Sequence, residues 1–170
     1  HKSRIQPSSM DLTLSSECYE LKFSFLSPKG KIRNKLKTLS FKKHSLKNGL
    51  VFKKNHTYLV KLNEKLNLIS PIIGKCNPKS STGRLDIFCR TILDNSNEYE
   101  KIPFKYKGEM FIEVTCKSFN IKFNEGDSLN QMRLAYNQNI YLNDSQLKKI
   151  NYKNKICFSK RKAIFENGLK

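Results

Sequence analysis

Long apolar runs and paired cysteines are missing from this 170-residue chain. No apolar run approaches the roughly 20 residues that a membrane helix needs, and no apolar signal core follows the first residues. The five cysteines are odd in number and widely spaced, which argues against the disulfide framework of a secreted protein. We therefore expect a cytoplasmic protein. The sequence starts without methionine, so we also expect a fragment of a longer protein.

The ligand signature of zinc-dependent nucleobase deaminases is absent as well. Those enzymes combine His-x-Glu with Pro-Cys-x-x-Cys. None of His1, His44 and His56 is followed by glutamate two positions later, and no Cys-x-x-Cys pair occurs. Any base deamination by this chain would have to proceed without that zinc site.

Acidic side chains are few. The chain has 14 Asp and Glu against 33 Lys and Arg, which gives a formal net charge of +19. Nucleic-acid binding is one explanation, and an AT-rich coding sequence, which favours Lys, Asn and Ile, is the other. Lysine dominates over arginine, and no basic–aromatic stacking pattern accompanies the charge. We therefore favour the second explanation, and a polyanionic substrate is compatible with both.

Short runs of alternating apolar and polar residues make up most of the chain. Alternation of this kind, interrupted by turn residues, is typical of β-strands. Many short strands with little helical signal predict an all-β sandwich or distorted barrel with short helices. A further short helix is predicted over residues 144–150. The expected strands lie before Leu14 and at residues 19–26, 56–62, 85–91, 109–117, 119–123 and 129–136.

The most basic segment covers residues 27–54. Ile32, Leu36 and Leu39 have the spacing of one face of a short helix. The surrounding lysines and Gly49 favour a solvated surface excursion instead, which is the interpretation we adopt from the sequence.

One stretch combines residue types that suit phosphate binding and polar chemistry. Residues 77–86 read Asn-Pro-Lys-Ser-Ser-Thr-Gly-Arg-Leu-Asp and lie between two apolar runs. A lysine, hydroxyl groups and backbone N–H groups near a glycine can hold a polyphosphate. The same composition also fits a polar turn between two strands, so the stretch alone is weak evidence.

Three further stretches, at residues 5–12, 108–114 and 125–131, occur in fixed order around this motif. Together the four stretches resemble the dCTP deaminase family, within the dUTPase-like superfamily, and in particular its long bacterial form with two such domains in tandem. The resemblance covers roughly residues 5–136. It implies a dUTPase-like, jelly-roll-like β-fold over residues 1–139. Residues 140–170 would then be a linker and the truncated start of a second, similar domain.

The resemblance also implies an activity. Family members convert dCTP to dUTP and ammonia in pyrimidine deoxynucleotide metabolism, without zinc and with Mg²⁺ carried on the triphosphate. They form threefold assemblies with active sites between subunits. dCTP and dUTP are therefore the expected ligands, with no membrane or nucleic acid as partner.

Glu113 is the expected catalytic base. Hydrolytic deamination adds water at C4 of the base, so a carboxylate must take up and return protons. Strand alternation places Glu113 on the face opposite Met110, Ile112 and Val114. Periodicity alone leaves an exposed strand glutamate equally open, and the resemblance favours catalysis. Ser80 and Arg84 match the family residues that orient the water and the polar edge of the base.

The expected substrate contacts follow from the same resemblance. Lys79 and Ser81 match triphosphate contacts, and Gly83 belongs to the same motif. The family's Ile-Asp-Pro-Gly-Tyr-x-Gly turn is only partly kept: Tyr106 and Gly108 are present, Lys105 stands at a glycine position, and the sugar-binding aspartate is missing. Glu100 is our candidate replacement for that aspartate. Gly126 and Gln131 match a turn glycine and a strand glutamine, both interpreted as structural first, with Gln131 kept as a substrate-binding candidate.

Two alternative functions stay open. A dUTPase would hydrolyse the α–β phosphate bond, but it needs a water-activating aspartate in the central turn and usually a glycine-rich C-terminal arm, neither of which is visible here. A non-catalytic nucleotide-binding domain is the other alternative, because one copy of a tandem pair can lose its activity.

Overall fold

The computed structural model describes residues 4–69, 71–136 and 142–156. The chain divides into two compact units, His1–Tyr136 and Asn137–Lys170. The boundary predicted after residue 139 lies outside the described residues. The identity of the second unit as the start of another domain stays a prediction.

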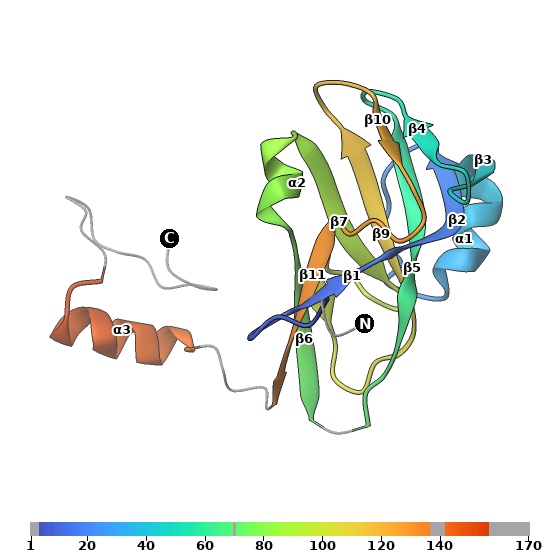
Figure 1. Ribbon diagram of the computed structural model, residues 1–170. Coiled ribbons are helices and arrows are strands. Elements are labelled where there is room, and N and C mark those ends of the chain that lie inside the picture. The colour runs from blue at the N-terminus through green and yellow to red at the C-terminus, as the bar shows by residue number, and fades with distance from the viewer. Residues whose placement is uncertain (1–3, 70, 137–141, 157–170) are drawn as a thin grey trace. The chain divides into compact units, whose positions relative to one another are not determined.

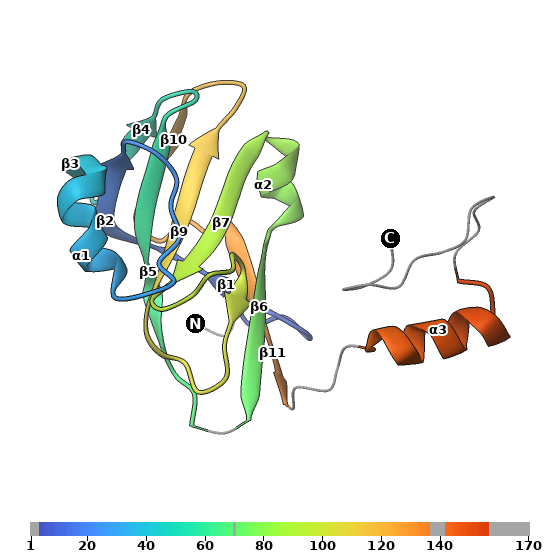
Figure 2. The same ribbon diagram turned by 180° about the vertical axis from the view of Figure 1, so that it is seen from behind.

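Antiparallel strands form most of the first unit (Figures 1 and 2). A five-stranded sheet has the order β3-β2-β5-β9-β7, a four-stranded sheet has the order β1-β11-β6-β8, and β10 pairs with β4. The all-β prediction is confirmed. The strands are β1 (Met10–Leu12), β2 (Leu14–Leu21), β3 (Ser40–Ser45), β4 (Leu50–Phe52), β5 (Thr57–Asn67), β6 (Ile72–Pro78), β7 (Ile87–Leu93), β8 (Lys101–Ile102), β9 (Lys107–Cys116), β10 (Ile121–Phe123) and β11 (Asn130–Tyr136).

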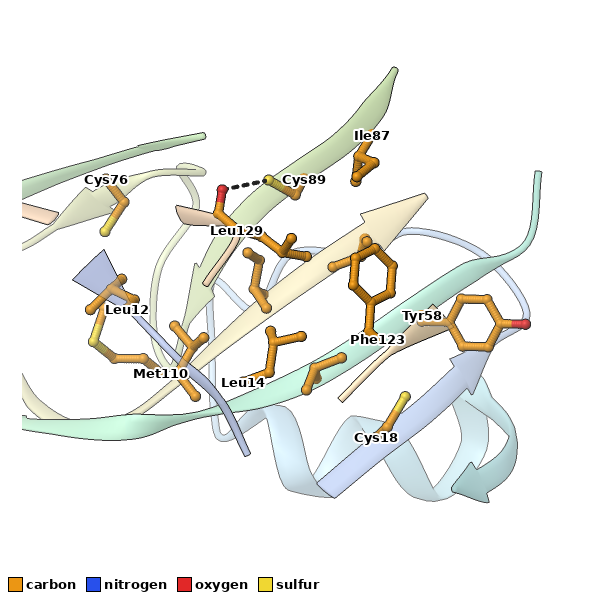
Figure 3. Close-up of a cluster of buried hydrophobic side chains, with 14 of the residues drawn as sticks. Leu12, Leu14, Cys18, Tyr58, Cys76, Ile87, Cys89, Met110, Phe123 and Leu129 are labelled. Carbon is orange, nitrogen blue, oxygen red and sulfur yellow. Dashed lines mark hydrogen bonds between the residues drawn. The ribbon is translucent and has the colours of Figure 1, made fainter. Parts of the chain in front are cut away.

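The main core is built by apolar side chains from all three sheets (Figure 3). The face of β9 that carries Met110, Ile112 and Val114 packs into it, as the alternation predicted. Burial of these apolar surfaces is the main favourable contribution to the fold. Figure 3 also shows the Cys89 thiol approaching the carbonyl oxygen of Leu129 at 3.8 Å.

A second, smaller core covers the opposite face of the five-stranded sheet. Helix α1 (Ile32–Leu39) buries Ile32 and Leu36 there, against Leu59 of β5 and Phe111 of β9, with Phe25 from the segment before the helix. The solvated excursion favoured for residues 27–54 is therefore wrong for this part. Of the two lysines in the helix, Lys37 is exposed and the Lys35 ammonium donates to the Leu26 carbonyl at 3.0 Å, so the apolar stripe is free to be buried.

Strand β2 ends earlier than the sequence suggested. It stops at Leu21, and Phe23 is exposed, so the strand expected over residues 19–26 is wrong in its C-terminal half. Phe25 is buried, but it packs under α1 rather than continuing the sheet. Tertiary packing, not strand alternation, explains this apolar residue.

Two turns depend on positive φ angles. Gly126 has φ of 91° in the turn before β11, which confirms its structural assignment, since glycine adopts this conformation without steric cost. Lys105 has φ of 56° in a turn closed by the amide of Tyr106 and the carbonyl of Pro103 at 3.2 Å. This left-handed conformation explains why the corresponding family position is a glycine.

The second unit contributes one described element. Helix α3 (Asp144–Lys153) begins with a reciprocal capping box between Asn143 and Gln146, and its position confirms the predicted short helix. None of its residues is buried. Within the described ranges, no helix is long and apolar enough to cross a membrane.

Candidate functional site

Residues 77–86, the stretch predicted to bind phosphate, contain the short helix α2 (Ser80–Arg84), which lies between β6 and β7. Two hydrogen bonds fasten it to the carbonyl oxygen of Leu129: the Thr82 hydroxyl donates at 2.8 Å and the Lys79 amide at 3.0 Å. At its other end, the Lys117 amide donates to the Asp86 carbonyl at 3.0 Å. The motif is therefore a rigid corner of the fold rather than a loose turn.

The polar side chains of α2 point outward. Ser80, Ser81 and Arg84 are exposed, and none has a side-chain partner among the residues that the structure describes. Gly83 is also exposed, with open space where a Cβ would stand. Its amide donates to the Lys79 carbonyl at 3.3 Å, so that N–H is already used within the helix. The corner presents hydroxyls and a guanidinium to solvent.

Lys79 belongs to a separate polar cluster beside α2. Its ammonium lies 2.5 Å from a carboxylate oxygen of Asp11 in β1. Asp11 faces Gln131 across the β1–β11 pairing, and the Gln131 side chain accepts a 3.0 Å hydrogen bond from the Ser9 hydroxyl. The upstream stretch at residues 5–12 and the motif at residues 77–86 are thus brought together through β11.

Glu113 lies in the middle of β9 and is only 2% exposed. Glu113 is therefore not exposed to solvent, and that alternative from the sequence analysis is wrong. Its Oε1 accepts a 2.6 Å hydrogen bond from Nη2 of Arg90, while its Oε2 is buried without a hydrogen-bond partner in the described part of the chain. A buried carboxylate of this kind is costly unless it is paired or functional.

Arg90 is held by two aromatic contacts and one polar contact in addition to Glu113. Its guanidinium carbon lies 3.9 Å from the ring centroid of Tyr99 and 4.8 Å from that of Phe88. Nη2 also donates to the Ser24 hydroxyl at 2.9 Å. Arginine stacks well on aromatic faces because its charge is planar and weakly hydrated.

The candidate catalytic residues do not all meet within one chain. Arg90 pairs with Glu113 across β7 and β9, whereas Ile87, the first residue of β7 after α2, pairs with Cys116. The two pairs are three residue steps apart, about 10 Å along β7. Within this chain the arginine that holds Glu113 is therefore Arg90. Ser80 and Arg84 lie in α2, beyond the N-terminal end of β7.

Glu100 and Tyr106 face the interior. The Glu100 carboxylate accepts from the Thr91 amide at 3.0 Å and from the Asn130 side-chain amide at 3.2 Å, and burial raises its pKa. The buried Tyr106 hydroxyl donates to the Glu109 carbonyl at 2.5 Å, and burial raises its pKa to about 12. The Tyr106 ring also occupies the space that a Cβ on Gly108 would need. Both candidate residues thus have structural partners in this chain.

Metal-ligating side chains do not gather in the described ranges, where no group of three His, Cys, Asp or Glu could hold an ion. The four described cysteines are buried and free, and burial raises the pKa of each thiol. They are therefore not poised as nucleophiles.

Arg90 was missed by the sequence analysis. Its strand reads Ile-Phe-Cys-Arg-Thr-Ile-Leu, an apolar run with one charge in it. A charge inside an apolar strand is costly to bury unless it is paired or functional, and this signal could have marked Arg90 as a candidate. Its pairing with Glu113 could not be predicted, because it depends on the register between β7 and β9.

Comparison with known proteins agrees with this architecture. Residues 1–138 match the family described as 2'-deoxycytidine 5'-triphosphate deaminase (DCD) N-terminal domain. The chain belongs to this family.

A crystal structure of 2'-deoxycytidine 5'-triphosphate deaminase from Agrobacterium tumefaciens is similar, with a TM-score of 0.78 and 35% identity over 92% of this chain. This chain spans 46% of that protein. A native EIAV dUTPase matches at a TM-score of 0.43 and 19% identity, covering 55% of this chain and 72% of that one. No curated protein matches the chain.

Proposed function

We propose that the protein containing this chain hydrolyses dCTP to dUTP and ammonia, and that Glu113 is the general base. The observation that carries the proposal is the almost completely buried Glu113 with one unpartnered carboxylate oxygen, at the family's catalytic position. The similar Agrobacterium protein is a dCTP deaminase. Because this chain covers about half of that protein, the activity of the whole protein is part of the proposal.

The chemistry requires a group that moves several protons. Water adds to C4 of the cytosine ring while a carboxylate accepts its proton. The carboxylic acid passes this proton to N3 of the ring. The carboxylate then transfers the proton of the new C4 hydroxyl to the amino group, and ammonia leaves as the C4 carbonyl forms. The unpartnered Oε2 of Glu113 is the atom that can accept and return these protons, since Oε1 is bound by Arg90.

Ser80 and Arg84 enter the site from a neighbouring copy in this proposal. Both side chains are exposed on α2 and lie away from Glu113 of their own chain. A threefold assembly with sites between subunits would bring the α2 of one copy to the Glu113 of another. Ser80 would then orient the water, and Arg84 would stabilise developing negative charge.

The triphosphate is proposed to bind at Lys79 and Ser81, beside the open Gly83. Mg²⁺ is part of this substrate, since it binds phosphate oxygens and retains several waters. Contacts of Glu100, Tyr106 and Gln131 with the nucleotide remain predictions. The cytoplasm is the proposed location of the reaction.

Product analysis tests the function. The full-length protein is incubated with dCTP or dUTP and Mg²⁺, with and without a zinc-selective chelator, and products are separated by chromatography. We expect dUTP and ammonia from dCTP, unaffected by zinc removal. Pyrophosphate and dUMP from dUTP without deamination would identify a dUTPase instead, and binding without turnover would identify a non-catalytic domain.

A further inference from the structure

The pairing of Arg90 with Glu113 uses only one point of contact. Nη2 of Arg90 donates to Oε1 at 2.6 Å, while Nε of Arg90 and Oε2 of Glu113 are both buried without a hydrogen-bond partner among the described residues. Arginine and a carboxylate frequently form two parallel hydrogen bonds, as a fork. A second hydrogen bond, from Nε of Arg90 to Oε2 of Glu113, would complete such a fork and pair both atoms. The structure must therefore contain contacts that keep this second bond from forming.

Three side chains outside β9 hold the guanidinium in its single-point position. Tyr99 and Phe88 stack on it at 3.9 and 4.8 Å from its central carbon. The Ser24 hydroxyl accepts from the same Nη2 at 2.9 Å and lies 3.1 Å from the Tyr99 hydroxyl. These contacts come from β7, the segment after β2 and the segment after β7, so the position is fixed by the tertiary structure.

Buried polar atoms are nearly always hydrogen-bonded, so a buried donor and a buried acceptor left unpaired within one ion pair call for an explanation. A general base, however, needs one oxygen that is free to take a proton. The geometry points to Arg90 as a positioning residue that orients Glu113 through Oε1 and leaves Oε2 available, with Ser24, Tyr99 and Phe88 preventing closure of the fork. This inference rests on the proposed deamination of dCTP.

Replacement of the arginine gives the first test. In the full-length protein, Arg90→Ala should lower kcat for dCTP by about 100-fold, the size of effect expected when a catalytic group is misplaced by about 1 Å. KM should change by less than threefold, because Arg90 is not assigned to bind the nucleotide. Added guanidinium chloride at millimolar concentration should restore part of kcat in this variant and not in the parent. Arg90→Lys should retain more activity than Arg90→Ala, because it keeps the charge without the planar group.

Arg33→Ala is the matched control. Arg33 also pairs with a glutamate of β9, Glu109, but it binds both carboxylate oxygens, at 2.5 and 3.0 Å. This variant should lower the thermal midpoint and leave kcat per folded enzyme unchanged, with no response to guanidinium. Equal loss of kcat in both variants, without guanidinium rescue of Arg90→Ala, would overturn the inference and assign Arg90 a purely structural role.

A milder variant, Ser24→Ala, keeps the inference testable if Arg90→Ala does not fold. Ser24→Ala removes one acceptor of Nη2 and should allow the fork to close, which lowers kcat several-fold at constant KM. A folded Ser24→Ala or Arg90→Ala variant with the parental kcat would contradict the inference alone. If the parent protein produces no dUTP from dCTP, the proposed function fails, and this inference fails with it.

Discussion

Two arginine–carboxylate clusters share one face of β9 and differ in how completely their polar atoms are paired. Glu109 and Glu113 are four residues apart on the strand, so both point to the same side. Arg33 of α1 forks onto Glu109 and also donates to both carboxylate oxygens of Glu17, at 2.9 and 3.1 Å. Arg90 meets Glu113 through a single hydrogen bond.

The fully paired cluster of Arg33, Glu17 and Glu109 has the properties of a structural ion-pair network. Hydrogen bonds from Arg33 lower the pKa of Glu17 to about 2 and that of Glu109 below its ordinary value, and the two carboxylates raise the pKa of Arg33. The guanidinium carbon also lies 5.8 Å from the centroid of the buried Phe111 ring. These contacts link α1 to the sheet that it covers.

The two clusters differ both in burial and in the completeness of their hydrogen bonding. The Arg33 cluster is more exposed and has more hydrogen bonds, whereas the Arg90 cluster is more deeply buried and incompletely bonded. A polar group that is buried and also left unpaired has a cost that packing does not explain. Glu113 therefore differs from Glu109 in two respects: it is more deeply buried, and one of its carboxylate oxygens has no partner among the described residues.

The largest expected effect is at Glu113. Glu113→Gln removes the proton acceptor with little change in shape, and we expect kcat for dCTP to fall by about 10²–10⁴-fold, with the thermal midpoint equal to or above that of the parent. Ammonia release and thermal unfolding measure the two quantities. Glu109→Gln is the matched control, with kcat retained and stability lowered; the opposite pattern would interchange the roles of the two glutamates.

Lys79, which pairs with Asp11, is a third paired charge, and we expect its ammonium to bind the triphosphate of dCTP. Lys79→Ala should weaken dCTP binding by about 1.5–3 kcal/mol, as for loss of a charge-assisted hydrogen bond, with a smaller effect on kcat. Calorimetric titration with dCTP and Mg²⁺ at two salt concentrations measures it, because exposed electrostatic contacts weaken with salt. An unchanged affinity would remove Lys79 from the phosphate site and leave only its pairing with Asp11.

Arg33→Ala should lower the free energy of unfolding by about 1–2 kcal/mol, since it leaves the carboxylates of Glu17 and Glu109 without their shared donor. The value stays modest because the Arg33 side chain is 40% exposed. Urea unfolding of parent and variant gives the difference. A variant as stable as the parent would show that the fully paired cluster does not stabilise the packing of α1 on the sheet.

The smallest effect is the acid dependence of that same cluster. The folded-state pKa of Glu17 is lowered from 4.5 to about 2, so its stabilisation is complete above pH 4.5 and is lost as the pH falls toward 2. The stability difference between the parent and Arg33→Ala should therefore shrink across this window in urea titrations. A difference that stays constant from pH 6 to pH 2.5 would contradict the assigned pairing.

Local pattern was sufficient for much of the strand content and for part of the site. The alternation of β9 correctly separated Met110, Ile112 and Val114 from the face of Glu113. The pattern did not predict α1, because a helix stripe as short as Ile32 and Leu36 is convincing only when a partner surface exists. That surface comes from Leu59 and Phe111, distant in sequence.

The family and the β-rich class could be predicted from the sequence alone, because they depend on residue types at fixed local spacing, and the resemblance to that family selected Glu113 as the candidate base. Only the tertiary structure decided which arginine meets which glutamate. That choice depends on the register of β7 against β9 and on side chains from two further segments, Ser24 and Tyr99. Local sequence cannot encode such long-range pairing in a readable form, because each partner satisfies the same local rules as an ordinary strand or loop residue.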